Sequence, residues 1–232
     1  MYQVLQFDAD NTLFDFDACE QQALIAAFQQ YHIDLTAPIL SCFHAINADL
    51  WGKYERGELS REEVVYTRFQ KLFSRFGIAA DGVRFEHTYQ SKLAQGHQLM
   101  EGAEVLLRAL KPRYRLFLVS NGVVATQIQR LHDSGLYPLF ERIFLSEEIG
   151  SRKPQPAFFE PVLQAAAPAS RKELLLIGDS LSSDIAGANA IGIDCVWMNP
   201  KRLPTVKDLH INYEIRRLEE LYAILELPKN AG

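Results

Sequence analysis

The sequence predicts an α/β fold: a doubly wound, Rossmann-like parallel sheet core with an inserted all-helical cap domain. Short apolar segments that are typical of buried strands alternate with segments of helical periodicity along most of the chain. One long stretch breaks this alternation, because it shows helical periodicity and no convincing strand. Polar residues gather where several of the strands end, which is where open parallel sheets bind their ligands.

Six segments have the short, apolar character of strands. In chain order they are Val4–Asp8, Arg115–Ser120, Ile143–Ser146, Leu174–Asp179, Cys195–Asn199 and, with a weaker pattern, Ile211–Ile215. After the last of them, an apolar stripe at helical spacing predicts a carboxyl-terminal helix that contains Leu218, Leu221, Tyr222 and Leu225. Strands that alternate with helices favour a parallel sheet with helices on both faces.

Residues 16–97 predict a helical domain inserted between the first two strands. Apolar residues recur there at helical spacing, as in Leu24, Ala27, Phe28 and Tyr31. The core domain would then comprise residues 1–15 and 98–232. The connections near Asp15–Asp17 and Gln95–Gly102 would serve as hinges.

Composition and charge restrict the possible partners. Among 232 residues, 48% are hydrophobic and 23% are charged, with a net charge of −5 and no basic run. This balance favours a globular protein and argues against binding to nucleic acid polymers or to membrane surfaces. The cysteines Cys19, Cys42 and Cys195 are odd in number and far apart, so we expect reduced thiols in a cytoplasmic protein.

Chemically reactive residues lie at four of the predicted strand ends. The stretches are Asp8-Ala9-Asp10-Asn11-Thr12, Ser120-Asn121-Gly122, Ser151-Arg152-Lys153-Pro154 and Gly178-Asp179-Ser180-Leu181-Ser182-Ser183-Asp184. In a parallel sheet these ends share one edge, so residues that are distant in sequence would converge on one pocket.

This set of residues suits phosphoryl transfer. One of the two aspartates after the first strand would bind or attack while the other moves protons. Carboxylate oxygens suit Mg²⁺, and a lysine with turn N–H groups would neutralise a phosphate. Taken alone, Asp8 and Asp10 could equally cap a helix. An EF-hand calcium loop is excluded, because Leu13 and Cys19 occupy the positions that need glycine and glutamate.

In order, these stretches resemble the four motifs of the haloacid dehalogenase superfamily, and the helical insertion lies where that superfamily has its C1 cap. The chain also resembles the pyrimidine 5′-nucleotidase branch. That second resemblance depends on Phe7-Asp8-Ala9-Asp10-Asn11-Thr12-Leu13-Phe14, Asn47-x₃-Trp51-x₂-Tyr54, Arg68-Phe69 and Leu145-Ser146-Glu147-Glu148-Ile149-Gly150-Ser151-Arg152-Lys153-Pro154.

The resemblance implies roles for the carboxylates. Asp8 would be the nucleophile and, with Asp179, a ligand of Mg²⁺. Asp10 would be the general acid and base, and its backbone carbonyl would also reach the metal. Asp184 would lie in the second shell of the metal or order Lys153. The resemblance also disfavours cleavage of a carbon–halogen bond, because true dehalogenases of this superfamily lack an aspartate at the position of Asp10.

For the substrate, the resemblance implies a small-molecule phosphate monoester, most specifically a pyrimidine nucleoside 5′-monophosphate. Ser120 and Asn121 would bind the transferring phosphoryl group, and Lys153 would hold it against Asp8. Substrate specificity would come from the cap residues Asn47, Trp51, Tyr54 and Arg68. A sugar-phosphate phosphatase, a phosphomutase and a catalytically inactive binding protein of the same fold are the alternatives; the intact motifs argue against the last.

Overall fold

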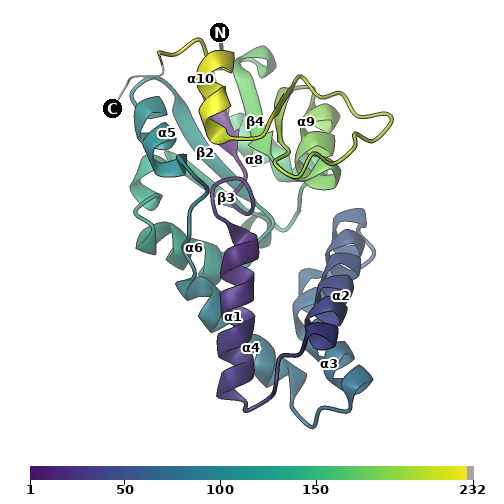
Figure 1. Ribbon diagram of the computed structural model, residues 1–232. Coiled ribbons are helices and arrows are strands. Elements are labelled where there is room, and N and C mark those ends of the chain that lie inside the picture. Colours follow the sequence, from purple (N-terminus) through teal and green to yellow (C-terminus); the bar gives the residue numbers. More distant parts are fainter. Residues whose placement is uncertain (229–232) are drawn as a thin grey trace. The chain divides into compact units, whose positions relative to one another are not determined.

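The structure is a computed structural model that describes residues 1–228. The chain divides into two compact units (Figure 1). Met1–Phe16 and the chain from His97 onward form the first, here called the core unit, and Asp17–Gly96 forms the second, the helical unit. No helix among the described residues combines the length and the apolar composition needed to cross a membrane.

The core unit contains a six-stranded sheet in which all neighbouring strands are parallel. The order across the sheet is β3-β2-β1-β4-β5-β6. The strands are β1 (Val4–Phe7), β2 (Arg115–Ser120), β3 (Arg142–Leu145), β4 (Leu174–Gly178), β5 (Asp194–Met198) and β6 (Tyr213–Ile215). Every strand overlaps the segment predicted for it, and the doubly wound α/β class is confirmed.

Four predicted strands extend one residue too far at their carboxyl ends. Ser146 lies just beyond β3, where α7 (Ser146–Ile149) begins. Asp8, Asp179 and Asn199 lie just beyond β1, β4 and β5. Each of these three begins a loop instead of continuing the strand, and the side chains of Asp8 and Asn199 form hydrogen bonds outside the sheet ladder. These loop starts are the positions at which a parallel sheet presents functional side chains.

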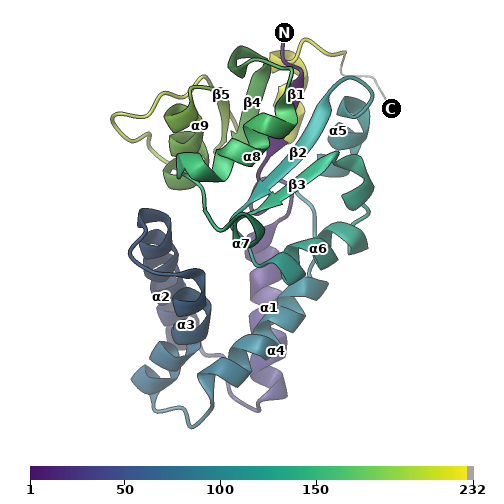
Figure 2. The ribbon, with the colours of Figure 1, turned by 180° about the vertical axis from the view of Figure 1, so that it is seen from behind.

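Both faces of the sheet are apolar and covered by helices, as expected of a buried parallel sheet. Leu5 and Phe7 face a cluster that includes α5 (Ala103–Leu110) and α10 (Leu221–Ile224), seen in front of the sheet in Figure 1. Val4 faces a cluster that includes α8 (Pro156–Ala166) and α9 (Ala186–Ile191), and α8 is seen in front in Figure 2. The alternation along β1 therefore separates two layers of core.

Short elements complete the core unit. They are α6 (Val124–Asp133), η1 (Tyr137–Leu139), α7 (Ser146–Ile149), η2 (Arg171–Glu173), η3 (Leu181–Ile185) and η4 (Leu218–Glu220). The predicted carboxyl-terminal helix forms as two short pieces, the 3₁₀ turn η4 followed by α10. Its apolar stripe is nevertheless buried, because Leu218, Leu221, Tyr222 and Leu225 all belong to the core.

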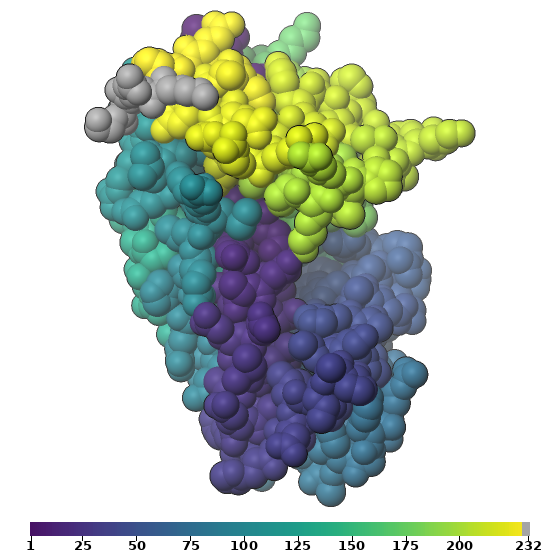
Figure 3. Space-filling view, in the orientation of Figure 1, coloured from purple at the N-terminus to yellow at the C-terminus, as the bar shows by residue number. Residues whose placement is uncertain are grey.

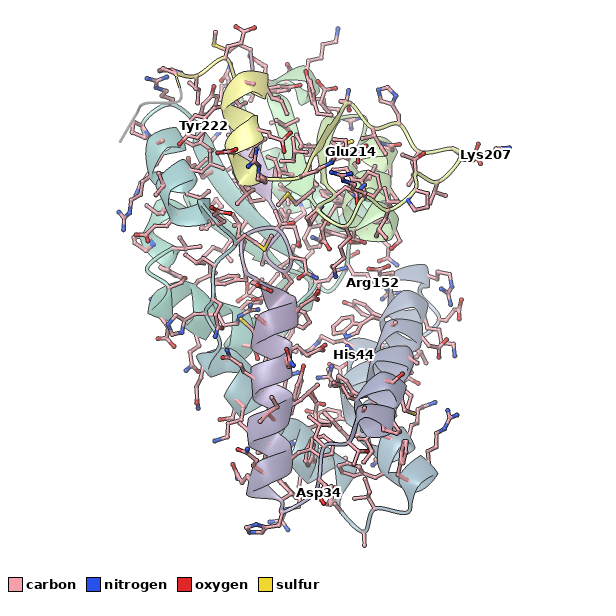
Figure 4. The ribbon with its side chains drawn as sticks, in the orientation of Figure 1. Asp34, His44, Arg152, Lys207, Glu214 and Tyr222 are labelled. Atoms are coloured by element: carbon pink, nitrogen blue, oxygen red, sulfur yellow. The ribbon has the colours of Figure 1, made fainter. Side chains whose placement is uncertain are left out.

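The segment between β5 and β6 extends outward from the core unit (Figure 3). Lys207 lies at its outer end, as Figure 4 shows, and the neighbouring Val206 is 55% exposed. Asn199 anchors the base of the segment, because its amide exchanges hydrogen bonds of 2.8 and 3.0 Å with the backbone of Leu203 and donates to Glu214. The segment is therefore exposed at its tip and held at its base.

The helical unit contains α1 (Phe16–Gln30, from its second residue onward), α2 (Ala37–Arg56), α3 (Arg61–Phe76) and α4 (Gly82–Gln95). Its interior is rich in stacked and edge-to-face aromatic rings: Phe28, Phe43, Phe69, Phe73, Phe85 and Tyr89. Gly57 and Gly77 end α2 and α3 with positive φ angles of 85° and 63°. The unit thus has a hydrophobic core of its own.

Candidate active site

The register of the sheet brings the predicted motif residues to one edge. Phe7 pairs with Leu118 on β2 and with Ile177 on β4, so these three strands end at nearly the same level. Asp8 follows β1 directly, and its backbone N–H donates to the carbonyl of Ile177 at 2.9 Å. Side chains that follow the three central strands are thereby placed next to one another.

Lys153 lies at the centre of this edge and is buried, with 1% of its surface exposed. Its Nζ donates to Asp8 Oδ1 at 2.5 Å, to Asp184 Oδ1 at 2.6 Å and to the carbonyl of Val119 at 2.9 Å. Burial by itself lowers the pKa of the ammonium, but Asp184 and Asp8 outweigh it, and the pKa lies above its ordinary value. The lysine is therefore a permanent positive charge beside Asp8.

Three carboxylates surround this lysine. Asp8, Asp179 and Asp184 each place an oxygen within 4.8 Å of the others, which is close enough to share a metal ion. Burial raises the pKa of Asp8 to about 7 despite the opposing effect of Lys153, and Asp184 and Asp10 add to the increase. Burial, with Asp8 and Asp184 nearby, also raises the pKa of Asp179. When all three carboxylates are ionised, the cluster holds more negative charge than Lys153 alone balances.

Asp184 is a residue of η3, and its side chain lies against Gly178 at the end of β4. Both of its oxygens are engaged, one by Lys153 and the other by the backbone N–H of Ser180 at 3.1 Å. A Cβ added at Gly178 would lie only 2.3 Å from the carboxyl carbon of Asp184, so this position accepts glycine only. The close approach of β4 to Asp184 explains the glycine before Asp179.

Asp10 faces helix α6, where two side chains bind its carboxylate. Arg130 Nη1 donates to Oδ1 at 2.5 Å, and Gln127 Nε2 donates to Oδ2 at 2.6 Å. Arg130 is fully buried and its guanidinium lies 4.3 Å from the ring centroid of Phe14. Gln127 and Arg130 lie outside the sequence motifs, and the one sequence signal for them is their spacing of three residues, which places them on the same side of a helix.

Ser120 and Asn121 at the end of β2 have different surroundings. Ser120 Oγ accepts hydrogen bonds from the Gly122 N–H at 3.0 Å and from Gln127 at 3.1 Å. The Asn121 amide pairs with the backbone of Lys153, accepting from its N–H at 2.9 Å and donating to its carbonyl at 3.0 Å. Asn121 thereby ties the end of β2 to the lysine, whereas its role in phosphate binding stays a prediction.

In the helical unit, Arg68 is an interior residue with 2% of its surface exposed. Its guanidinium forms a two-point ion pair with Glu86, at 2.7 and 2.8 Å, and donates to Asn47 Oδ1 at 2.9 Å. It also lies 4.7 Å from the ring centroid of Tyr89. All of these contacts are with residues of the same unit. The predicted role of Arg68 in substrate specificity stays a prediction.

The other predicted specificity residues also have internal partners. Asn47 donates to Glu20 Oε1 at 3.2 Å, which joins Arg68, Asn47 and Glu20 in one polar network. Trp51 and Tyr54 form an edge-to-face pair with ring centroids 5.5 Å apart. The sequence analysis missed Glu20, whose pKa burial raises. The role of Asn47, Trp51 and Tyr54 toward a substrate stays a prediction.

Several known proteins are similar to this chain along nearly its whole length. The family model of haloacid dehalogenase-like hydrolases matches residues 2–192. The HAD-hydrolase YfnB of Bacillus subtilis is 43% identical over 226 residues, which cover 97% of this chain and 96% of the relative. The crystal structure of magnesium-bound YfnB, described as revealing interdomain movement, has a TM-score of 0.93 and covers 97% of this chain and 99% of that chain.

Two further relatives have named substrates. The pyrimidine 5′-nucleotidase PynA of Streptococcus pneumoniae is 38% identical over 226 residues, which cover 97% of this chain and 95% of the relative. The pyrimidine 5′-nucleotidase YjjG of Escherichia coli is 28% identical over 219 residues, which cover 94% and 96% of the two chains. Both alignments extend through the helical unit as well as the core unit.

Proposed function

Because this chain belongs to the haloacid dehalogenase-like hydrolases, we propose that it is a phosphatase that forms an aspartyl-phosphate on Asp8. The observation that carries the proposal is the contact between the buried Lys153 ammonium and Asp8, inside a cluster of three carboxylates. A nucleophilic carboxylate needs a fixed cation beside it, because both the carboxylate and a phosphate monoester are anions. Lys153 supplies that cation at a hydrogen-bonding distance of 2.5 Å.

The donor set fits Mg²⁺. The cluster offers carboxylate oxygens, which hard divalent cations prefer. Lys153 pairs with two of the three carboxylates and is the one cation among the described residues in contact with them, so a divalent cation would balance the excess charge when all three are ionised. Asp8, Asp179 and the backbone carbonyl of Asp10 would hold the ion. Asp184 would order Lys153, since both of its oxygens already accept hydrogen bonds. When bound, Mg²⁺ supplies charge neutralisation at the phosphoryl group.

The residues of the chain divide the reaction into two steps. In the first, a carboxylate oxygen of Asp8 forms a bond to phosphorus while the ester bond breaks, and Asp10 gives its proton to the departing ester oxygen. In the second, Asp10 takes a proton from water, and the water oxygen attacks phosphorus and releases Asp8. Inorganic phosphate leaves, and both aspartates return to their starting states.

For the substrate we propose nucleoside 5′-monophosphates, pyrimidine ones in particular. Support comes from the names of two relatives, both pyrimidine 5′-nucleotidases and matched over more than nine-tenths of the chain. A phosphate site reads the phosphoryl group alone, so the rest of the substrate must be recognised elsewhere. We assign that role to the helical unit, which corresponds to the cap domain that the sequence predicts over residues 16–97.

The test is hydrolysis of a substrate panel with Mg²⁺ and with excess EDTA. The panel contains p-nitrophenyl phosphate, pyrimidine and purine nucleoside monophosphates, and sugar phosphates with and without a bisphosphate activator. We expect Mg²⁺-dependent release of phosphate, fastest from pyrimidine nucleotides. Preference for a sugar phosphate, or dependence on the bisphosphate, would replace the nucleotide assignment with a sugar phosphatase or a phosphomutase.

The nucleophile is tested by Asp8→Asn. The amide removes the nucleophilic oxygen while keeping the size of the side chain, so we expect turnover to fall by about 10³-fold or more with the fold intact. Circular dichroism and thermal unfolding check the fold. Near-normal hydrolysis by this variant would refute the aspartyl-phosphate mechanism.

A further inference from the structure

We propose that Gln127 and Arg130 of α6 are positioning residues that hold the Asp10 carboxylate in place for proton transfer. The proposal rests on the phosphatase mechanism above, in which Asp10 protonates the leaving group. Neither residue belongs to the motifs that the sequence analysis identified. Both act through Asp10 and would touch no reacting atom themselves.

The two donors divide the carboxylate between them. Arg130 binds Oδ1 at 2.5 Å and Gln127 binds Oδ2 at 2.6 Å, so rotation of the Asp10 side chain would break both bonds. The donors also support each other, because Arg130 Nη1 lies 3.2 Å from Gln127 Oε1. Because each oxygen is bound by a different side chain of α6, this helix determines the orientation of the carboxylate.

The donors themselves are fixed by packing. Arg130 is fully buried and Gln127 is 1% exposed, whereas the side chain of Asp10 is 28% exposed. The guanidinium of Arg130 lies over the rings of Phe14 and Phe16, at 4.3 and 5.8 Å from their centroids. The two donors are therefore buried, and the Asp10 carboxylate is the part of this network that solvent or a substrate can reach.

The same glutamine links Asp10 to the phosphate-binding motif. Gln127 Nε2 also donates to Ser120 Oγ at 3.1 Å. A Cβ added at Gly122 would lie 2.5 Å from this nitrogen, so the turn after β2 needs glycine to admit the glutamine. The Gln127 side chain thus binds both Asp10, the proposed proton carrier, and Ser120.

Unlike the Arg68–Glu86 pair, in which both side chains are 2% exposed, the Arg130–Asp10 pair joins a buried arginine to a partly exposed carboxylate at the edge of the sheet where the motifs meet. A positioning role predicts a specific kinetic defect. If Asp10 is displaced, esters that need protonation of the leaving oxygen suffer most, and p-nitrophenyl phosphate suffers least because p-nitrophenolate leaves without a proton. A merely structural role would reduce the hydrolysis of all esters by one factor.

The experiment compares Arg130→Met and Gln127→Leu with the wild type on two monoesters, p-nitrophenyl phosphate and a nucleoside 5′-monophosphate. We expect kcat/KM for the nucleotide to fall about tenfold or more beyond the loss for p-nitrophenyl phosphate, within the range of general acid catalysis. Arg130→Lys, which keeps a cation, should recover part of the loss. If both esters lose activity in equal proportion in both variants, the proposal is wrong.

A double-variant cycle makes the comparison sharper. In the background of Asp10→Asn, Arg130→Met should add no further preference for p-nitrophenyl phosphate, because the group that it positions is already disabled. An additional independent preference would contradict the proposal. If Arg130→Met does not fold, Gln127→Leu decides, and equal losses on the two esters in that variant overturn the proposal.

Arg115→Met is the matched control. Arg115 also pairs with a carboxylate, Glu141 at 2.7 Å, and lies 5.2 Å from the centroid of Phe117, but it begins β2 at the opposite end of the strand from Ser120. We expect its loss to show as lower thermal stability with an unchanged ratio between the two esters. Failure of the proposed function is distinct from failure of this proposal, because the wild type itself would then hydrolyse neither ester.

Discussion

The position of Asp8 places its carboxyl group at the proposed reaction site and also makes its ionised form less stable. Asp8 is 7% exposed and its carboxyl group lies beside two other carboxylates, and these surroundings raise its pKa to about 7. An ionised nucleophile at neutral pH therefore depends on added positive charge. Lys153 provides part of that charge, and the excess of carboxylates indicates that a divalent cation provides the rest.

The raised pKa of Asp8 predicts a pH dependence of Mg²⁺ binding. Below pH of about 7 the folded, metal-free protein holds a proton on Asp8, and Mg²⁺ must displace that proton. We expect the apparent Kd to increase about tenfold or more per pH unit below 7, because the pKa of Asp179, the other proposed carboxylate ligand, is also raised. Calorimetric titration with Mg²⁺ between pH 5.5 and 8.5 measures this, and a constant Kd across that interval would contradict it.

Stability without the metal should change in the matching direction. The folded pKa of Asp8 lies above its ordinary value of 3.8, so the folded state keeps a proton that the unfolded chain has lost between about pH 4 and 7. The free energy of unfolding that Asp8 contributes therefore falls as pH rises through that window and is constant above it. Thermal unfolding in EDTA follows this change, with Asp8→Asn as the control that removes it.

At the scale of elements, the loop after β4 depends on a close approach between a side chain and the backbone. β4 can end at Gly178, directly before Asp179, only because glycine leaves room for the Asp184 carboxyl group. At Gly187 on α9 the neighbour is instead the ring of Phe159, 2.7 Å from an added Cβ. One glycine therefore serves the site, and the other serves helix packing.

These two glycines give a matched pair of variants. Gly178→Ala and Gly187→Ala should each destabilise the protein by about 1–3 kcal/mol through overpacking. Only Gly178→Ala displaces Asp184, so we expect it alone to weaken Mg²⁺ binding and to lower kcat. Denaturant unfolding and Mg²⁺ titration of both variants check this. Equal Mg²⁺ affinity in the two variants would show that Asp184 does not organise the site.

At the scale of the whole molecule, the chain forms two units that each have their own interior. The core unit has two apolar layers around its sheet, and the helical unit has an aromatic core with a buried Arg68–Glu86 ion pair. The catalytic residues that we propose all lie in the core unit. The helical unit contributes none of them, which is consistent with the role in substrate selection proposed for it.

Substrate selection by the helical unit is tested by Asn47→Ala and Trp51→Ala. Loss of an amide or an aromatic face that binds the nucleoside should lower kcat/KM for nucleotides by about tenfold or more relative to p-nitrophenyl phosphate. Tyr66→Ala is the matched control, because Tyr66 is an aromatic residue of α3 that is 38% exposed. If both variants lose the two activities equally, Asn47 and Trp51 support the fold of the helical unit and do not select the substrate.

The sequence by itself determined the class of fold and predicted which strand ends would carry the chemistry. Periodicity marked the six strands and the helical block, because alternation of apolar residues is a local property of the chain. The motifs after β1, β2 and β4 could be predicted to meet, since parallel strands present their carboxyl ends at one edge. The Asp8–Lys153–Asp184 contacts are consistent with that prediction.

Only the tertiary structure decided which side chains meet Asp10 and what surrounds Arg68. Arg130 lies 120 residues from Asp10 along the chain, and an arginine on an amphipathic helix has no local mark that directs it inward. Nothing in the sequence marks an acidic partner for Arg68, and packing of α3 against α4 pairs it with Glu86. Partners of this kind depend on which face of a helix is buried and at what distance, and these follow from three-dimensional packing alone.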